Sequence, residues 1–448
     1  MNSFSRRAML QMTTAAAVHF PAAPSASTGL LQPDERAAHE KRLIDYLSET
    51  APQLLRPALG KFSFPSVAPS LAGREYSASL WDWDTLWTCR GLFAFAARNR
   101  QRALRDRVIE HAKGSFLNFF AQQNAVGRIP ILMTDKDTDL LRSTAPGAPI
   151  SANQAKPVFA QLALLIADNG GGTDWLHEQF DPLLRFYAAW DRHNLSSCGL
   201  YVWGNDVAIG NDNDPTTFGR PDFSSANLLL NSLFAADLND AAELASRLNR
   251  PTDATLLKRR ADRLQDRIRT LCWDERDRFF YTVDVQCHDH RAELLPQIKP
   301  GMAMSWQVLP LRIQTFTGFL PLWCGAATPA QARALVATNY AADDRLRCGA
   351  GVRSLSRLES MYSLAFSSNP SNWLGPVWII ANYLVWSGLK RYGFEAEARA
   401  LADKTLYLLS EDIARNGSMN EYYAPDTGEA LSHKGFMDWN LLVLEMIA

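Results

Sequence analysis

Two segments of the sequence carry carboxylates in settings suited to acid–base chemistry. The first, residues 203–215, is rich in glycine and asparagine and contains three aspartates, Asp206, Asp212 and Asp214. The second, residues 417–429, places Glu421 before a pair of tyrosines and a Pro-Asp-Thr-Gly turn. Hydrolysis of a glycosidic bond needs one carboxylic acid to protonate the leaving oxygen and a second carboxylate to activate water or to attack. The two segments offer candidates for both roles.

Both segments also have a plainer interpretation. Aspartates in a turn-rich loop commonly accept hydrogen bonds from backbone amides. Asp212-Asn213-Asp214 has oxygen-rich spacing that could hold calcium, although the EF-hand pattern with its closing Glu is missing. The Cys-His-Asp-His of residues 287–290 is too compact for one tetrahedral metal site. We therefore predict neither a metal nor a cofactor and keep calcium as the alternative.

The 13 tryptophans indicate the kind of substrate. Several stand beside Asp, Asn or Gly-Pro, as in the Trp-Asp-Trp-Asp of residues 81–84 and in the stretch from Trp373 to Trp378. Sugar rings present apolar C–H faces and hydroxyl edges, so aromatic platforms next to carboxylates suit them. Any single tryptophan could instead be a core residue. We expect a small carbohydrate to be the partner of this chain.

Helical periodicity dominates beyond residue 35 and supplies the scaffold. Helices are predicted near residues 35–50, 79–98, 101–123, 153–168, 173–192, 223–247, 252–272, 313–323, 328–340, 376–391, 394–414 and 437–447. They fall into consecutive pairs in which one helix tends to be apolar and its neighbour more charged. This alternation predicts an all-α fold, the (α/α)6 barrel, which is a toroid of six helical hairpins. A helical-repeat solenoid is the competing all-α fold, and no self-similar repeat supports it.

The longest stretches without a helical pattern are too long for inert connections. They lie at residues 124–152, 194–222, 273–312, 341–375 and 415–436. Long loops at one end of a rigid scaffold are where binding sites are built, so we expect the active site on one face of the barrel. Residues 32–448 are predicted to form one catalytic domain, with local β-structure at residues 279–283.

The beginning of the sequence has the features of an export signal. Arg6 and Arg7 precede a mildly apolar stretch that ends near Phe20, and small residues follow at 22–27. This arrangement is typical of a twin-arginine signal peptide, so we exclude residues 1–31 from the fold and expect a periplasmic or secreted protein. A disordered tail with a chance arginine pair is the alternative. The apolar run is too short to span a membrane, and the net charge of −1 favours neither nucleic acid nor an anionic membrane.

Five motifs in chain order make the sequence recognisable. These are Trp83-Asp84-Thr85, Asn153-Gln154-Ala155-Lys156-Pro157, the segment from Gly210 to Pro215, the stretch with Tyr362, Trp373, Gly375-Pro376-Val377-Trp378 and Asn382-Tyr383-Leu384, and Glu421-Tyr422-Tyr423 followed by Phe436 and Trp439. From about Tyr76 onward the sequence resembles glycoside hydrolase family 63 and the related mannosylglycerate-hydrolase-like proteins, which share a clan-level fold with trehalases. The usual Gln-Pro-Pro of the second motif is altered here.

The resemblance implies an inverting, exo-acting α-glycosidase. Asp212 takes the position of the general acid and Glu421 that of the general base, with the two carboxyls roughly 6.5–9.5 Å apart and a water between them. Asp212 must then be protonated at the working pH, which a partly dry pocket promotes. The predicted substrate-binding residues are Trp83, Asp84, Gln154, Lys156, Arg220, Tyr362, Trp373, Gly375, Trp378, Tyr422 and Trp439. Lys156 and Arg220 have two interpretations: they bind an anionic leaving group such as glycerate, or they pair with nearby acids.

Other activities stay open as alternatives. A trehalase-like disaccharide hydrolase is the nearest, although the chain has Ser-Asn-Trp-Leu at residues 371–374 where trehalases have Gln-Trp-Asp. A barrel that only binds sugar is disfavoured by the presence of both carboxylates. A polysaccharide lyase, which uses Tyr or His to abstract a proton, is disfavoured because His433 alone among the histidines lies in a matched loop. Asp206 and Asp214 compete for the acid role, and glucose and mannose both fit as the sugar of a small substrate.

Overall fold

The computed structural model describes residues 30–147, 149–287, 297, 306–341, 344–365 and 370–448. Almost all of the predicted export signal lies outside the described residues. The described α-helices are α1 (Pro33–Thr50), α2 (Asp82–Arg98), α3 (Arg102–Phe120), α4 (Phe159–Ile166), α5 (Phe180–Asn194), α6 (Leu228–Arg247), α7 (Pro251–Leu271), α9 (Leu320–Trp323), α10 (Pro329–Val336), α11 (Ile379–Arg391), α12 (Glu395–Asn416) and α13 (Val443–Met446).

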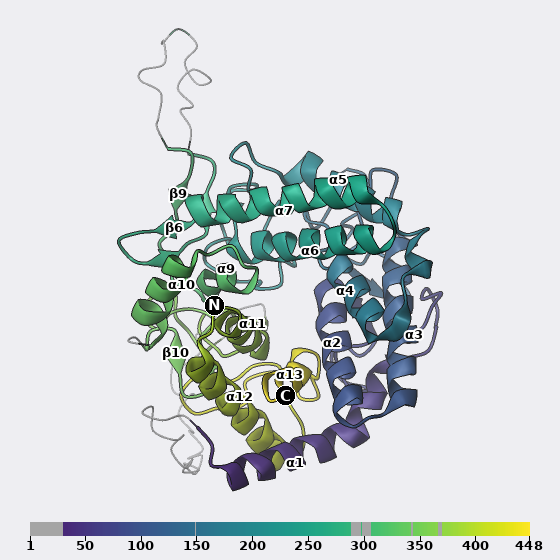
Figure 1. Ribbon diagram of the computed structural model, residues 1–448, viewed down its shortest axis with the longest axis vertical. Helices are drawn as coiled ribbons and strands as arrows, with labels where there is room; N and C mark the ends of the chain where they lie inside the picture. The colour runs from purple at the N-terminus through teal and green to yellow at the C-terminus, as the bar shows by residue number, and fades with distance from the viewer. Residues whose placement is uncertain (1–29, 148, 288–296, 298–305, 342–343, 366–369) are drawn as a thin grey trace, which may run out of the picture.

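The helices form an inner and an outer ring (Figure 1). In the inner ring α2 contacts α4, α4 contacts α6, α6 contacts α9, α9 contacts α11, and α13 contacts both α11 and α2, so the ring closes. The outer helices α3, α7 and α12 pack against α2, α6 and α11 respectively, each next to it in the chain. α1 packs against α12 and completes the outside. The predicted (α/α)6 barrel is confirmed.

The composition of each helix explains whether it lies in the inner or the outer ring. α6 is almost entirely apolar in its first half, and the side chains from Leu228 to Ala235 are all buried. α7 carries many charges and buries only Leu257, Ala261, Leu264 and Ile268, which recur every three or four residues. A helix with a narrow apolar stripe packs one face against the core, whereas a helix that is apolar all round is enclosed.

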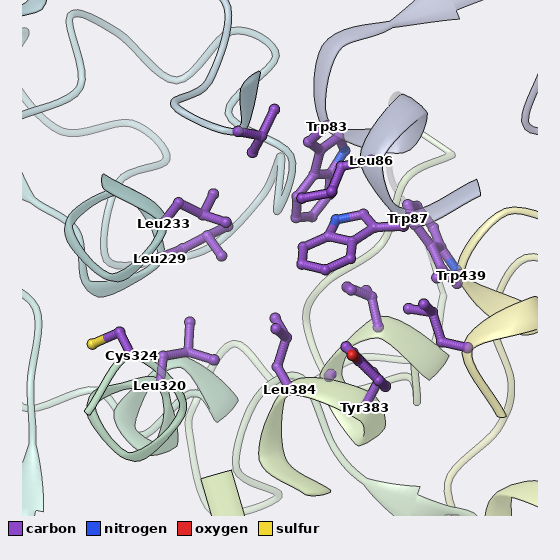
Figure 2. Close-up of a cluster of buried hydrophobic side chains, with 14 of the residues drawn as sticks. Trp83, Leu86, Trp87, Leu229, Leu233, Leu320, Cys324, Tyr383, Leu384 and Trp439 are labelled. Atoms are coloured by element: carbon purple, nitrogen blue, oxygen red, sulfur yellow. The ribbon is translucent and has the colours of Figure 1, made fainter. Parts of the chain in front are cut away.

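The centre of the ring is filled with side chains. Figure 2 shows tryptophans and leucines of α2, α6 and α11 pointing toward one another, together with Leu320 and Cys324 from the α9 segment. Trp439, from the short 3₁₀ turn Trp439–Leu442 before α13, closes this cluster on one side. Because the interior is packed, a ligand site has to lie at an end of the barrel and not along its axis.

Several helix ends follow from capping chemistry. The Thr328 hydroxyl accepts a hydrogen bond from the amide of Gln331 at 3.1 Å, and Pro329 takes the first position of α10. The Asn227 side chain accepts from the amide of Leu229 at 2.8 Å and starts α6. Gly417 ends α12 with a φ of 65°, in the left-handed region that favours glycine.

Five predicted helix starts were too early, including those of α9 and α13, which begin at Leu320 and Val443 and not near residues 313 and 437. α4 begins at Phe159 and not near residue 153, because the preceding segment contains Pro157 and is held extended by contacts of Asn153 and Lys156. α6 begins at Leu228 and not near residue 223, because Ser225–Ala226 pairs as a strand with residues 283–284. α5 begins at Phe180, after a short 3₁₀ turn, and not near residue 173.

In the described residues the β-structure consists of four two-stranded antiparallel sheets and one three-stranded antiparallel sheet. Its strands are β1 (Leu55–Arg56), β2 (Ser66–Val67), β3 (Ser79–Trp81), β4 (Leu132–Thr134), β5 (Ser225–Ala226), β6 (Trp273–Asp274), β7 (Phe279–Phe280), β8 (Val283–Asp284), β9 (Leu309–Pro310), β10 (Arg347–Cys348) and β11 (Gly351–Val352). The predicted β-structure at residues 279–283 is present as β7 and the start of β8. The pairing of β3 with β4 fixes the chain directly before α2. No described helix is long and apolar enough to cross a membrane.

Candidate active site

One pocket lies where the long loops meet the inner helices. Its volume is about 470 Å³, including space open to solvent. It is lined by Tyr76, Trp81, Trp83, Asp84, Lys156, Ala208, Gly210, Asp212, Ser371, Trp378, Glu421, Phe436 and Trp439. The structure therefore brings both predicted catalytic carboxylates, Asp212 and Glu421, to the wall of one pocket.

The lining residues precede or begin inner helices. Asp84 lies in the first turn of α2, Lys156 precedes α4, Asp212 precedes α6, Trp378 directly precedes α11, and Glu421 comes before the turn that leads into α13. The N-terminal end of a helix carries a partial positive charge, which favours a nearby carboxylate. This effect applies to Asp84, and not to Asp212 or Glu421, which lie in loops well before their helices.

Asp84 and Asp438 form a buried carboxyl pair beside the pocket. Asp438 is fully buried and accepts a hydrogen bond from the Thr88 hydroxyl at 2.8 Å. Burial, and then the charge of Asp82, raises the pKa of Asp84 to about 7, and burial raises the pKa of Asp438 well above its ordinary value. Two adjacent buried carboxylates cannot both ionise cheaply, so the pair shares a proton.

Glu421 is buried and contacts His433. Its carboxylate oxygen Oε2 lies against Nδ1 of His433, and its backbone amide donates to the carbonyl of Ser432 at 3.1 Å. Burial raises the pKa of Glu421, the hydrogen bond and charge of His433 lower it, and the charge of Asp212 raises it. The pKa of His433 is raised by the hydrogen bond to Glu421. A protonated imidazole therefore helps this buried carboxylate to stay ionised.

The three aspartates of the first loop have different surroundings. Asp214 is buried and accepts hydrogen bonds from the amide of Thr216 at 2.8 Å and from the side chain of Asn211 at 2.5 Å. Asp206 accepts from the amide of Gly219 at 3.0 Å and does not line the pocket. Asp212 alone of the three lines the pocket. In this geometry Asp206 and Asp214 serve the loop itself.

Aromatic rings form much of the pocket wall. Trp83 and Trp439 meet edge to face with their ring centres 5.8 Å apart, and Trp378 meets Trp439 in the same way at 5.6 Å. Trp373 does not reach the pocket, because it stacks behind Trp378 at 4.1 Å with the two rings nearly parallel. Trp373 therefore supports the pocket wall from behind.

Five other predicted substrate-binding residues are also absent from the pocket wall: Gln154, Arg220, Tyr362, Gly375 and Tyr422. Arg220 pairs with Asp284, which is the second of its two predicted interpretations. The Tyr422 hydroxyl donates to the carbonyl of Pro370 at 2.6 Å. Gly375 lies against the ring of Tyr362, which a Cβ would approach to 2.4 Å.

Gln154 and Lys156 lie on the same segment but differ in their contacts. Gln154 is buried, and among the described residues neither its amide nitrogen nor its amide oxygen has a hydrogen-bond partner. Lys156 lines the pocket and pairs with Asp82, so it also follows the second of its two predicted interpretations. Its ammonium nitrogen lies 3.0 Å from an Asp82 oxygen.

Sequence reasoning did not assign a site role to Tyr76, Trp81, Ser371, Phe436 or His433. The Tyr76 ring meets the rings of Trp81, His433 and Phe436 edge to face, so these side chains form one cluster at the pocket. Its members come from two short segments, residues 76–81 and 433–436, that lie far apart in the chain. Trp81 and Phe436 stand in motifs described above, whereas no local pattern links Tyr76 to His433.

The described residues contain no group of three or more His, Cys, Asp or Glu side chains that could hold a metal ion. In the suggested calcium segment, the oxygens of Asp214 are occupied by amide donors. His288, Asp289 and His290 of the compact Cys-His motif lie outside the described residues.

Comparison with known proteins finds similarity to mannosylglycerate and glucosylglycerate hydrolases. The family model described as "Mannosylglycerate hydrolase MGH1-like glycoside hydrolase domain" matches residues 77–437. Mannosylglycerate hydrolase from Thermus thermophilus is 35% identical over 148 residues, which is 32% of each chain. Glucosylglycerate hydrolase from Mycolicibacterium hassiacum is 31% identical over 144 residues, which is 30% of this chain and 29% of that one. The alignment thus spans about a third of these curated relatives.

Solved structures agree on the architecture. A GH63 mannosylglycerate hydrolase from Thermus thermophilus, in complex with Tris and D-glycerate, superposes with a TM-score of 0.64 at 18% identity, covering 92% of this chain and 100% of that one. Neutral trehalase from Saccharomyces cerevisiae superposes with a TM-score of 0.57 at 17% identity, covering 86% and 74%. At this level of identity the likeness establishes the fold.

Proposed function

This chain belongs to the mannosylglycerate hydrolase MGH1-like glycoside hydrolase family, and from that membership we propose that it is an inverting, exo-acting α-glycosidase. The substrate is a small α-glucoside or α-mannoside, such as a glycosylglycerate or a short oligosaccharide. Asp212 is the general acid and Glu421 the general base. The observation that carries the proposal is the meeting of these two carboxylates on the wall of one aromatic pocket.

The reaction is a single displacement at the anomeric carbon. Glu421 removes a proton from a water molecule, and the oxygen of that water bonds to the anomeric carbon. Asp212 gives its proton to the glycosidic oxygen as the bond between carbon and leaving group breaks. Because water enters on the face opposite to the leaving group, an α-linked substrate releases the β-anomer first.

The neighbouring residues position the sugar and exclude water. Asp84 accepts hydrogen bonds from sugar hydroxyls, and the proton shared with Asp438 balances its charge. Trp83, Trp378 and Trp439 cover the apolar faces of the ring.

The proposal is tested by proton NMR with a panel of substrates. The panel is glucosylglycerate, mannosylglycerate, trehalose, kojibiose and nigerose, with wild-type protein, Asp212→Asn and Glu421→Gln. We expect the β-anomer to appear first from at least one substrate, and each variant to lose roughly 100-fold or more in kcat. The substrate that is hydrolysed shows whether the sugar is glucose or mannose and whether the leaving group is charged or neutral.

Asp206→Asn is the matched control, because it also neutralises an aspartate of the same loop but one that does not line the pocket. It should keep most of the activity. Turnover of trehalose alone would favour the trehalase-like alternative. Sugar binding without turnover of any panel member, or full activity in Asp212→Asn or Glu421→Gln, would overturn the proposed mechanism.

A further inference from the structure

A buried ion pair lies directly against the pocket. The side chains of Lys156 and Asp82 are 2% and 0% exposed. The ammonium nitrogen of Lys156 lies 3.0 and 3.2 Å from the two carboxylate oxygens of Asp82. The same carboxylate accepts from the backbone amides of Lys156 at 2.6 Å and of Trp83 at 2.8 Å. Asp82 therefore joins the start of α2 to the segment before α4.

Lys156 reaches a third segment, the loop that contains Asp212. Its ammonium group donates a hydrogen bond to the carbonyl of Ala208 at 3.0 Å. Ala208 has a φ of 55° and Gly210 a φ of 98°, so the chain turns sharply here. A Cβ on Gly210 would lie 3.2 Å from the Cε atom of Lys156. The segment just before Asp212 thus packs against the Lys156 side chain.

The hydrogen-bonding capacity of this lysine is already used. An ammonium group has three protons, and the two oxygens of Asp82 and the carbonyl of Ala208 account for all of them. The cation also lies over the ring of Trp83, 5.6 Å from its centre. A buried ion pair is costly to desolvate and contributes little net stability, so its value here is in fixing geometry.

We propose that Lys156 is a positioning residue for the general acid: by holding the carbonyl of Ala208, it fixes the loop so that Asp212 faces the leaving oxygen. This inference rests on the proposed function, since it assigns Lys156 to the protonation of the leaving group. It predicts that loss of Lys156 harms substrates that need a proton on the leaving atom and spares those that do not.

The test compares leaving groups. Lys156→Met keeps the length of the side chain and removes the charge. Its kcat is measured on the best substrate of the panel and on the α-fluoride of the same sugar, from which fluoride departs with its electron pair and without protonation. We expect a loss of roughly 100-fold on the glycoside and a much smaller loss on the fluoride. A residue that only stabilises the fold would lower both rates by the same factor.

Two further variants complete the design. Lys156→Met leaves Asp82 buried without its partner, which is destabilising; the double variant Asp82→Asn with Lys156→Met removes both charges and should show the same dependence on the leaving group. Lys404→Met is the matched control, because Lys404 is a partly buried lysine on α12 that donates to the carbonyl of Cys348 at 2.8 Å. It should leave both rates unchanged.

Asp212→Asn separates this inference from the proposed function. If Asp212→Asn loses activity on the glycoside but not on the fluoride, and the Lys156 variants lose both equally or lose neither, only the inference about Lys156 is overturned. If Asp212→Asn itself shows no dependence on the leaving group, the proposed general acid is wrong.

Discussion

Glu421 is buried and yet, in the proposed reaction, must carry a negative charge. Burial raises its pKa, and the imidazole of His433 acts in the opposite direction. A negative charge on Asp212 raises the pKa of Glu421, and the charge of Glu75 raises the pKa of His433. Glu421 in turn raises the pKa of the buried Asp438. The ring of Tyr76 packs against the imidazole. His433 therefore lowers the pH at which Glu421 becomes protonated.

Replacing His433 should move the acidic limb of the pH–rate profile. Glu421 is active only when ionised, so kcat/KM falls as the pH drops through its pKa. His433→Asn removes the imidazolium that lowers this pKa. We expect the midpoint of the acidic limb to move up by roughly 1 pH unit. The measurement is kcat/KM as a function of pH for wild-type and variant.

His39→Asn is the matched control for this experiment. His39 lies on α1 and contacts the hydroxyl of Ser410 at 3.0 Å, away from the pocket. Its replacement should leave the acidic limb where it is. An unchanged midpoint in His433→Asn would mean that the contact with Glu421 has no influence on the base.

At the scale of single residues, sequence motifs identify the carboxylates of the site but not the side chains that surround them. Asp84, Asp212 and Glu421 each stand in a recognisable local pattern, and all three line the pocket. The contact of Tyr76 with His433 has no local signal, because the two residues meet only through the closed fold. Trp373 was predicted to form the pocket wall and instead stacks behind Trp378, and local sequence carries no information on which of two adjacent aromatic rings faces the pocket.

The loop between α5 and α6 depends on glycine at one position. Gly210 has a φ of 98°, and a Cβ there would lie 2.9 Å from the Cζ2 atom of Trp83. Any side chain would push the loop away from Trp83 and Lys156 and carry Asp212 with it.

Gly210→Ala should therefore lose activity while the protein stays folded. A displacement of about 1 Å at a catalytic group costs on the order of 100-fold in rate. Backbone strain at a positive φ adds a loss of stability of about 1–3 kcal/mol. The measurements are kcat on the best panel substrate and the free energy of unfolding.

Gly219→Ala is the matched control for Gly210→Ala. Gly219 lies near the end of the same loop with a φ of 70°, and a Cβ there would meet nothing within 4 Å. The Gly219→Ala variant has the backbone strain of a positive φ but no steric clash. Its free energy of unfolding should therefore fall, and its kcat should stay unchanged. Equal losses of kcat in the two variants would show that strain alone, and not the position of the loop, decides activity.

Helices could be predicted from the sequence because each buries a face at a helical period. The start of α6 was placed too early because Ser225–Ala226 pairs with Val283–Asp284, a contact between segments far apart in the chain. The start of α4 was placed too early because side chains of Asn153 and Asp82 hold the preceding segment. In both cases a tertiary contact overrides the local pattern, and the segment before α4 carries the pocket residue Lys156.

At the scale of the whole molecule, α1 and α12 close the outer ring. Leu43 and Leu47 of α1 are fully buried, and Arg36 of α1 pairs with Asp403 of α12. The hydroxyl of Tyr46 contacts that of Ser418 at 3.0 Å, three residues before Glu421. The closure of the ring is thus linked to the segment that presents the base.

Leu47→Ala should destabilise the whole barrel together with its pocket. Removing a fully buried leucine side chain costs about 2–5 kcal/mol. We expect activity and tryptophan fluorescence to be lost at the same, lower concentration of denaturant. Glu49→Ala, an exposed position on the same helix, should have little effect. Unfolding of α1 at a denaturant concentration at which the enzyme is still active would contradict this link between α1 and the pocket.

The contacts between residues 69–71 and 435–438 have a consequence for biosynthesis. The amide of Leu71 donates to the carbonyl of Gly435 at 3.0 Å, the amide of Met437 donates to Pro69 at 2.8 Å, and Thr88 contacts Asp438 across 350 residues of sequence. A nascent chain that has already exposed α2 to α12 outside the ribosome still lacks Phe436 and Trp439. Until those residues emerge, the apolar faces of α2 and α11 have no partner on that side, and contacts so distant in sequence form slowly. The pocket can therefore form only after residues 435–439 have left the ribosome, and until then these apolar faces are exposed to aggregation.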